Sequence, residues 1–142
     1  MKFLIIIVAL SGGLITSAIA AEPTILTGVV THVRDGDTIE VGKLPVRLIG
    51  VSAPELKEPL GEQSRQFMHE LAFGKTIRCE LNGKKTYDRF VGTCYLGKLD
   101  IGAAIIKAGL ALDCRRYSGG RYAGLETASA RMSIRLPRYC KR

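Results

Sequence analysis

This sequence of 142 residues lacks the marks of several common protein classes. It has no Cys-X-X-Cys pair, and neither of its two histidines stands at ligand spacing from a cysteine, so a structural zinc site is not expected. Internal repeats, linkers and low-complexity segments are also absent, which excludes a helical repeat array. The length favours one domain with a modest core, and it excludes a two-domain enzyme and a multi-span membrane protein.

The one long apolar run lies at the start of the chain and has the layout of a secretory signal. A basic residue at position 2 precedes the run, and the small residues of a cleavage site end it at Ala20. We therefore predict a signal peptide over residues 1–20, a secreted or periplasmic protein, and one domain over residues 21–142. The mostly apolar residues 3–19 are slightly short for a spanning helix, so we expect no stable membrane association after cleavage. Retention of this segment as an anchor is the alternative.

Positive charge is concentrated in the last part of the chain. Without the predicted signal, 20 basic and 13 acidic residues remain, which gives a net charge of +7. Residues 21–114 hold twelve of each sign, whereas residues 115–142 hold seven arginines, one lysine and a single acid, Glu126. Such a basic segment indicates a polyanion partner, either nucleic acid or an anionic membrane surface. The alternative is a solvated face that only aids solubility.

Cysteine usage agrees with export. The chain has four cysteines, an even number, and this favours disulfides in a protein that leaves the cytoplasm. Three connectivities are possible. Cys79 and Cys94 fall in neighbouring predicted strands, so a bond across that hairpin is geometrically plausible and would leave Cys114 to pair with Cys140. In the alternative, Cys79 and Cys94 are reduced residues of the core.

Short segments rich in Val, Ile and Thr predict strands, and apolar residues at helical spacing predict helices. The expected strands are residues 27–33, 38–41, 46–51, 76–81 and 90–96. The expected helices run from Pro59 to Gly74, from the N-cap Asp100 to Gly109, and over residues 121–133 with Tyr122, Leu125, Ser129 and Met132 facing inward. This order suits a mostly β protein in which helices pack around a five-stranded barrel.

Charged side chains cluster at the ends of the second and third strands. Asp35-Gly36-Asp37-Thr38 opens one strand, Arg47 lies within the next, and Ser52-Ala53-Pro54-Glu55 follows where that strand leaves the sheet. This order can bring two carboxylates and a guanidinium to one rim of the barrel. A phosphodiester site needs these groups: an anion to hold a hard cation, a planar cation to bind phosphate oxygens, and a carboxylate to orient or deprotonate water.

The ordered set DGDT, VRLIG, APE, TYDRFVG and KAGLAL resembles the staphylococcal nuclease family, and the resemblance covers residues 27–132. It implies an α+β fold, a five-stranded OB-fold barrel packed with three α-helices. It also implies a Ca²⁺-dependent nuclease that cleaves phosphodiester bonds, with DNA or RNA as the nucleic acid partner. We expect the protein to be a monomer.

By position, the resemblance assigns roles to eight residues of this chain. The metal ligands are Asp37, Ser52 and the Ala53 carbonyl, the catalytic residues are Arg47, Glu55 and Arg89, and the nucleotide-contacting residues are Tyr87 and Tyr117. In this assignment Glu55 orients or deprotonates the attacking water, and the two arginines stabilise charge that develops on the phosphate oxygens. Packing at the rim is the alternative role for the two tyrosines.

Two positions depart from the family pattern. Ser52 stands where the family has a calcium-ligating aspartate, and it offers only a neutral oxygen. Calcium affinity should therefore be weak, or another divalent cation is used. Asp88 stands where a glycine usually precedes the second arginine, and it could restrain Arg89 by an ion pair or supply a replacement acid.

The sequence thus favours a secreted nuclease over two other functions. One alternative, which Ser52 supports, is a catalytically weak or inactive OB-fold module that binds nucleic acid or another polyanion. Retention of Asp37, Arg47, Glu55 and Arg89 argues against it. A purely structural, disulfide-linked protein would explain the fold but not these charges. Because the predicted site lies in the neutral part of the chain, we expect the basic C-terminal segment to hold nucleic acid separately from the chemistry.

Overall fold

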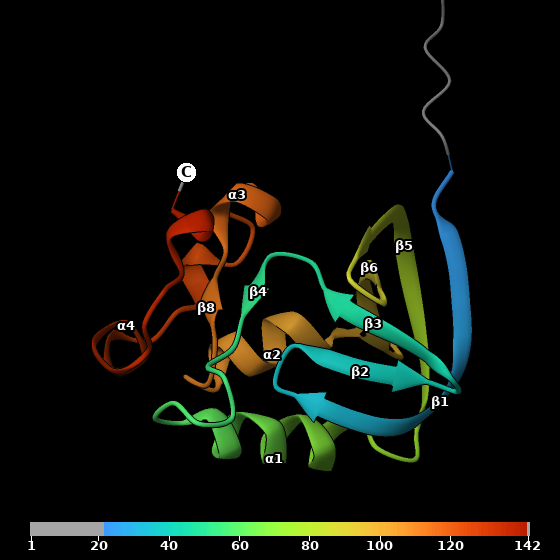
Figure 1. Cartoon of the computed structure of the whole chain (residues 1–142), viewed down its shortest axis with the longest axis horizontal. Coiled ribbons are helices and arrows are strands. Elements are labelled where there is room, and N and C mark those ends of the chain that lie inside the picture. Colours follow the sequence, from blue (N-terminus) through green and yellow to red (C-terminus); the bar gives the residue numbers. More distant parts are fainter. Residues whose placement is uncertain (1–21, 142) are drawn as a thin grey trace, which may run out of the picture.

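The computed structural model describes residues 22–141, so the signal predicted for residues 1–20 lies outside the described part. The strands are β1 (Thr24–Asp35), β2 (Thr38–Val41), β3 (Leu44–Leu48), β4 (Val51–Ser52), β5 (Thr76–Thr86), β6 (Arg89–Leu96), β7 (Leu99–Asp100) and β8 (Leu112–Asp113). The helices are α1 (Gly61–Ala72), α2 (Ile101–Lys107), α3 (Arg115–Ser118) and α4 (Ala128–Ser133), with 3₁₀ turns η1 (Ala123–Leu125) and η2 (Arg138–Cys140). The protein is therefore a mixed α+β structure, which confirms the predicted fold class (Figure 1).

Five of the strands pair into a closed ring. β1, β2 and β3 form an antiparallel meander, β5 and β6 form a hairpin, and β1 pairs antiparallel with β5. The ring is closed by β3 and β6, which run parallel to each other, with Val46 opposite Phe90 and Leu48 opposite Gly92. A meander closed by this parallel pair is the strand arrangement expected of an OB-fold barrel.

The long strand β1 belongs to two sides of the ring. Residues 24–29 pair with β5, and residues 30–35 pair with β2. The register with β2 shifts between Val30 and His32, and again between Val33 and Asp35, and bulges of this kind bend and twist a strand. The bent strand ends at Asp35, so it delivers the following turn to the rim of the ring.

Apolar side chains from the strands and from two helices fill the interior. The helices contribute residues one turn apart, so that each presents one apolar face to the ring. The buried set includes Ile39, Val46 and Leu48 from the strands, Met68 and Ala72 from α1, and Ile101 and Ile105 from α2. As predicted, Asp100 caps α2: its Oδ1 accepts hydrogen bonds from the N–H groups of Gly102 at 2.9 Å and Ala103 at 3.1 Å.

The prediction of one helix over residues 121–133 is wrong, because the structure breaks this segment into η1 and α4. The break lies at Thr127, which is extended and caps α4 by accepting a hydrogen bond from the Ala130 N–H at 3.1 Å. Of the four side chains predicted to face inward, Tyr122 alone is buried, and Met132 is 83% exposed. Ala130 takes the buried position on α4 instead.

Two short strands, β4 and β8, join the barrel rim to the C-terminal part of the chain. The structure divides the strand predicted over residues 46–51 into β3 and β4, and β8 was not predicted. β4 and β8 pair antiparallel, with Val51 opposite Asp113 and Ser52 opposite Leu112. The pairing continues where the Cys114 N–H donates a hydrogen bond to the Gly50 carbonyl at 2.8 Å. The chain therefore enters its basic C-terminal part directly beside Ser52.

The four cysteines form two disulfides in the structure. Cys79 and Cys94 lie directly opposite each other in β5 and β6 and are bonded across that hairpin. Cys114, just before α3, is bonded to Cys140 in η2, which lies 26 residues later in the chain. Two disulfides are compatible with an extracellular or periplasmic protein. Within residues 22–141, the structure has no helix with the length and apolar character needed to cross a membrane.

Candidate active site

The turn between β1 and β2 positions the candidate metal carboxylate Asp37. Asp35 Oδ1 accepts a hydrogen bond from the Asp37 N–H at 3.0 Å, the local bond by which aspartate stabilises such turns. Gly36 lies where α1 and the loop after β4 approach the turn. A Cβ atom at Gly36 would lie 1.9 Å from Ser64 Oγ and 2.8 Å from Ala53 Cβ. Glycine is therefore required for this packing, which fixes the turn against the loop that carries Ala53.

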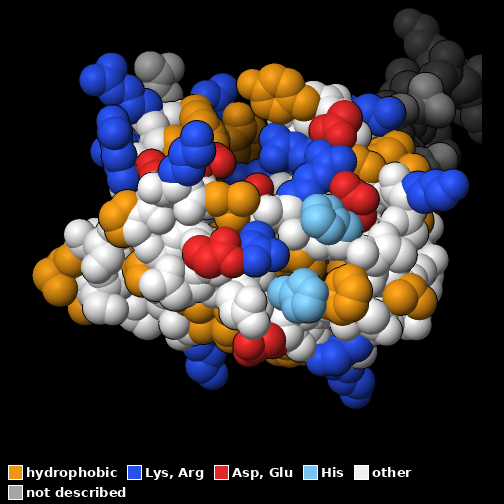
Figure 2. All heavy atoms as spheres, turned by 60° about the horizontal axis from the view of Figure 1, so that its bottom comes forward, with side chains coloured by type: hydrophobic (Ala, Val, Ile, Leu, Met, Phe, Trp, Pro, Cys, Tyr) orange, Lys and Arg blue, Asp and Glu red, His pale blue; other side chains and the backbone are white. Residues whose placement is uncertain are grey.

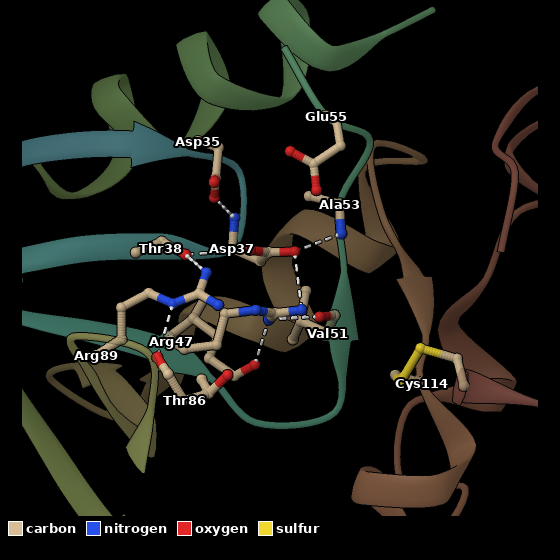
Figure 3. A network of polar contacts seen from close by, with 12 residues as sticks. Asp35, Asp37, Thr38, Arg47, Val51, Ala53, Glu55, Thr86, Arg89 and Cys114 are labelled. Atoms are coloured by element: carbon tan, nitrogen blue, oxygen red, sulfur yellow. Dashed lines mark hydrogen bonds and ion pairs between the residues drawn. A yellow bond between two sulfur atoms is a disulfide. The ribbon is translucent and has the colours of Figure 1, made fainter. Parts of the chain in front are cut away.

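The side chain of Asp37 is buried and is held by three neighbours (Figure 3). Its Oδ2 accepts a hydrogen bond from the Ala53 N–H at 2.8 Å and lies 3.2 Å from Arg47 Nη2, while its Oδ1 accepts one from the Thr38 hydroxyl at 3.3 Å. Burial raises the pKa of Asp37 to about 7, the charge of Arg47 opposes that rise, and the nearby Asp35 adds to it. Oδ1 has the weaker contacts of the two oxygens, so it is the atom best placed to bind a cation.

Arg47 both pairs with Asp37 and holds the turn between β3 and β4. Its Nη1 donates hydrogen bonds to the carbonyl oxygens of Leu48 at 2.8 Å and Val51 at 2.7 Å. The side chain is only 15% exposed. Of the five N–H groups of the guanidinium, three serve these protein contacts, and Nε and one hydrogen of Nη2 remain for a phosphate.

Arg89 reaches the same rim from β6. Its Nη1 donates a hydrogen bond to the Thr38 hydroxyl at 3.2 Å, and its Nε donates one to the Thr86 carbonyl at 3.4 Å (Figure 3). The structure therefore links Arg89 to Asp37 through Thr38. Thr38 was not among the predicted site residues, although it is the last residue of the DGDT motif and could have been included on that signal.

Asp88 pairs with Arg34 of β1, and the ion pair expected between Asp88 and Arg89 is replaced by this contact. Arg34 Nη1 lies 2.9 Å from Asp88 Oδ2, and Arg34 Nε lies 2.8 Å from Glu40 Oε1. The hydrogen bond from Arg34 holds the pKa of Asp88 below its usual value. Asp88 thus anchors the turn between β5 and β6 to β1, and the Arg89 side chain is directed to Thr38.

Four of the predicted site residues line a pocket of about 720 Å³: Asp37, Ser52, Ala53 and Glu55. Ser52 is buried on β4, and Glu55 is exposed on the loop that follows. Figure 3 shows the Glu55 carboxyl turned back along this loop toward Ala53. The Glu55 N–H donates a hydrogen bond to Glu58 Oε2 at 2.9 Å, so Glu58, which also lines the pocket and was not predicted, holds the loop in place.

The opposite wall of the pocket is formed by the C-terminal segment. Its polar lining residues are Glu126, Arg131, Arg135, Arg138, Tyr139 and Lys141. The expectation that basic C-terminal residues lie apart from the chemistry is therefore wrong, because they share a pocket with Asp37 and Glu55. The cause is the chain path: β8 pairs with β4, and the bond between Cys114 and Cys140 returns the end of the chain to α3.

The two tyrosines predicted to contact nucleotides lie outside the lining of this pocket. Tyr87 is 93% exposed at the turn between β5 and β6, with its ring 5.7 Å from the Arg89 guanidinium and a φ of 56°. Tyrosine rarely adopts this left-handed conformation, and such strain is found most often at functional sites. Tyr117 on α3 is 51% exposed and lies beside Tyr139, with 6.4 Å between ring centroids. Tyr87 thus lies beside Arg89 of the rim, and Tyr117 lies beside Tyr139 of the C-terminal segment.

The oxygen donors at this rim fit a hydrated divalent cation. Ca²⁺ and Mg²⁺ take oxygen ligands, and Mg²⁺ usually keeps several waters beside one or two carboxylates. The donors available here are Asp37 Oδ1, the Glu55 carboxyl, and the neutral oxygens of Ser52 and Ala53. No cluster of three or more His, Cys, Asp or Glu side chains in residues 22–141 could hold a metal ion. A cation at this rim would therefore rely on Asp37 and on water.

Comparisons with known proteins identify the family of this chain. The family model described as staphylococcal nuclease homologue matches residues 45–131. An uncharacterized endonuclease of Haemophilus influenzae is 30% identical over 94 residues, which cover 63% of this chain and 53% of the relative. An uncharacterized endonuclease of Escherichia coli O157:H7 is 32% identical over 96 residues, which cover 64% of this chain and 63% of the relative.

A third relative carries a different kind of name. Succinoglycan biosynthesis protein ExoI of Rhizobium meliloti is 37% identical over 120 residues, which cover 75% of this chain and 61% of the relative. The matched part of this chain spans between half and two thirds of the length of these three relatives. The family match covers more than half of the chain and includes Arg47, Glu55 and Arg89. The chain belongs to the staphylococcal nuclease family.

Proposed function

We propose that this protein is an exported nuclease that hydrolyses phosphodiester bonds of DNA or RNA. The observation that carries the proposal is the convergence of Asp37, Arg47, Glu55 and Arg89 on one rim of the barrel. Burial of a carboxylate such as Asp37 costs free energy, and groups with pKa values raised in this way are concentrated at functional sites. The endonuclease names of two relatives support the same activity.

In the proposed reaction, the phosphodiester lies beside Asp37 with its non-bridging oxygens toward the two arginines. Glu55 is exposed and lines the pocket, where it orients a water and accepts a proton from it as the water oxygen bonds to phosphorus. The P–O ester bond opposite the water breaks, and the leaving oxygen takes a proton from solvent. Arg89 and the free donors of Arg47 stabilise the charge that develops on the phosphate oxygens. Arginine suits this role because its planar fork meets two oxygens and stays ionised.

A divalent cation is part of the proposal, held by Asp37, the Ala53 carbonyl and Ser52. When bound, it would act as a Lewis acid that neutralises charge on the phosphate. Ser52 supplies no negative charge, and one missing charge forgoes several kcal/mol of gross Coulomb attraction at an effective dielectric constant of about 20. In addition, Asp37 Oδ2 is engaged by the Ala53 N–H and by Arg47. We therefore expect weak Ca²⁺ binding or the use of another divalent cation.

Cleavage of a labelled single-stranded DNA tests the proposal. The oxidised protein without residues 1–20 is incubated with Ca²⁺, Mg²⁺ or Mn²⁺ and with EDTA, beside Ser52→Asp. The control is Asn82→Asp, which adds the same charge at an exposed position of β5, outside the pocket lining. We expect cleavage that EDTA abolishes, and a Ca²⁺ requirement that Ser52→Asp lowers about tenfold or more, as one carboxylate ligand should.

Two results would contradict these expectations in different ways. Cleavage in Ca²⁺ that responds equally to Ser52→Asp and Asn82→Asp would refute the explanation of the weakened cation site. Absence of cleavage with every cation, while DNA binding is retained, would refute the nuclease and favour the module that binds nucleic acid without cleaving it.

Export is supported by the two disulfides and by the signal-like residues 1–20. Cell fractionation followed by mass spectrometry of the intact protein tests this part. We expect an oxidised protein that begins at residue 21 and is found outside the cytoplasm. A full-length, reduced protein in the cytoplasm would contradict export.

A further inference from the structure

The pocket beside Asp37 has two walls of opposite charge. The barrel side carries Asp37, Glu55 and Glu58, and the C-terminal side carries basic residues. Arg131 on that side is neutralised, since its Nε lies 2.8 Å from Glu126 Oε2. The remaining basic lining residues are Arg135, Arg138 and Lys141, which are exposed and form no ion pair with any residue of the described part, 22–141. Figure 2 shows basic side chains gathered at this end of the molecule, with acidic side chains recessed beside them.

The C-terminal segment that forms this wall is fixed at both ends. At its start, Ile134 and Leu136 pack with Leu112 of β8, Ala130 of α4 and Leu60 before α1 in a small apolar cluster. At its end, Cys140 is bonded to Cys114. The backbone that carries the unpaired cations is therefore held in place before any ligand binds, so binding orders their side chains but not the chain itself.

Aromatic rings belong to the same wall, since Tyr139 lines the pocket and Tyr117 lies beside Tyr139. Tyr139 and Tyr117 are each 51% exposed, and their rings are tilted by 60° with 6.4 Å between centroids. The Arg116 guanidinium lies 5.7 Å from the Tyr117 ring. Exposed aromatic faces beside unpaired cations are the arrangement by which proteins hold single-stranded nucleic acid, because unpaired bases stack while phosphates meet the charges.

We propose that this C-terminal wall binds the nucleotides that neighbour the scissile phosphate of a single-stranded nucleic acid. Arg135, Arg138 and Lys141 contact successive phosphates, and Tyr139 stacks on an unpaired base. Tyr139 thereby extends the surface of Tyr117, to which the family resemblance already assigns nucleotide contact. The inference rests on the proposed nuclease function, since the catalytic rim defines which phosphate is cleaved. A flat lipid surface would leave the hollow between the two walls unfilled, whereas a flexible strand can enter it.

Salt-dependent binding without a divalent cation tests the phosphate contacts separately from cleavage. Anisotropy of a labelled single-stranded 12-mer in EDTA is measured between low and physiological salt for the wild type and for the double variant Arg135→Gln, Arg138→Gln. The matched control is Lys43→Gln, Lys107→Gln, which removes two exposed charges outside the pocket lining. Each phosphate contact on a single strand contributes about 0.7 to the slope of log affinity against log salt.

We expect the Arg135 and Arg138 variant to reduce this slope by about 1.4 and to weaken binding about tenfold or more at low salt, with a much smaller change in the control. Equal changes in the two variants would overturn the wall as a binding surface, whether or not the protein cleaves DNA. If the protein fails to cleave DNA with any of the cations, yet the Arg135 and Arg138 variant still reduces the slope, the nuclease function is refuted. The wall is then supported as the binding surface of a non-catalytic module.

The stacking contact is tested with Tyr139→Ala and with Tyr139→Phe, which keeps the ring. Thermal unfolding of each variant checks that the fold is intact. We expect Tyr139→Ala to weaken binding of the single-stranded 12-mer about fivefold or more, Tyr139→Phe to restore it, and a duplex of the same sequence to bind less tightly than the single strand. Equal binding of duplex and single strand, with no effect of Tyr139→Ala, would overturn the proposal for unpaired bases.

Discussion

Replacement of Gly36 by alanine tests how the catalytic turn is packed. The added Cβ would lie 1.9 Å from Ser64 Oγ, 2.8 Å from Ala53 Cβ and 3.0 Å from Ile105 Cδ1. Ser64 is completely buried on α1, so relief of the contact requires the helix or the turn to move. Overpacking of this kind costs about 1–3 kcal/mol of unfolding free energy. For a domain of this size, the melting temperature should fall by roughly 3–12 °C.

Thermal and urea unfolding of the oxidised protein measure this change. Gly124→Ala is the matched control, because no atom lies within 4 Å of a Cβ at that position, and we expect its effect to stay within about 0.5 kcal/mol. Ser64→Ala removes the closest contact, so it should recover part of the lost stability when combined with Gly36→Ala. Equal stability of Gly36→Ala and Gly124→Ala would refute the packing argument.

Contacts outside this turn can be tested in the same way. Arg34→Gln should lower the free energy of unfolding by less than about 1 kcal/mol, because the ion pairs of Arg34 are partly exposed. It should nevertheless slow cleavage, because it releases the turn that precedes Arg89. Thermal melting and cleavage assays measure the two effects, and unchanged cleavage would contradict the anchoring role. Asp100→Asn should keep the α2 cap but remove the charged oxygen that accepts from the buried Tyr122 hydroxyl and pairs with Arg121, and it should lower the free energy of unfolding in urea by about 1–3 kcal/mol; unchanged stability would contradict this role of Asp100. Replacement of Cys114 and Cys140 by serine should lower the free energy of unfolding by about 3–4 kcal/mol in the chain-entropy model. It should also raise KM more than it lowers kcat, and an unchanged KM would contradict the fixed C-terminal wall.

The barrel could be predicted because its signals are local. Each strand carries its own alternation and turn residues, and the Asp100 cap can be recognised from the few residues around it. The prediction of one helix over residues 121–133 was wrong, and the reason is also local. Tyr122, Leu125 and Met132 have helical spacing, but the competing cap at Thr127 starts a new helix and leaves Met132 in solvent.

The second wall of the pocket could not be predicted, because it depends on contacts between distant parts of the chain. The strands β4 and β8 have two residues each, too few to show any periodicity, and they are paired across more than 50 residues. The location of Asp37, Arg47 and Glu55 on one rim could therefore be predicted from the sequence. The location of Arg135 and Arg138 beside that rim could not. The extent to which Arg47 is occupied by backbone carbonyls likewise depends on how the turn after β3 folds.

In the proposed reaction, Glu55 activates water for phosphodiester hydrolysis at this rim. The single-turnover rate of single-stranded DNA cleavage, with protein in excess, tests this role in the wild type, Glu55→Gln and the control Glu70→Gln on the exposed face of α1. General acid–base catalysis contributes about 10²–10⁴-fold, so the rate of Glu55→Gln should fall by that factor while its DNA binding and the rate of Glu70→Gln stay close to wild type. A rate for Glu55→Gln within about threefold of wild type would contradict the account.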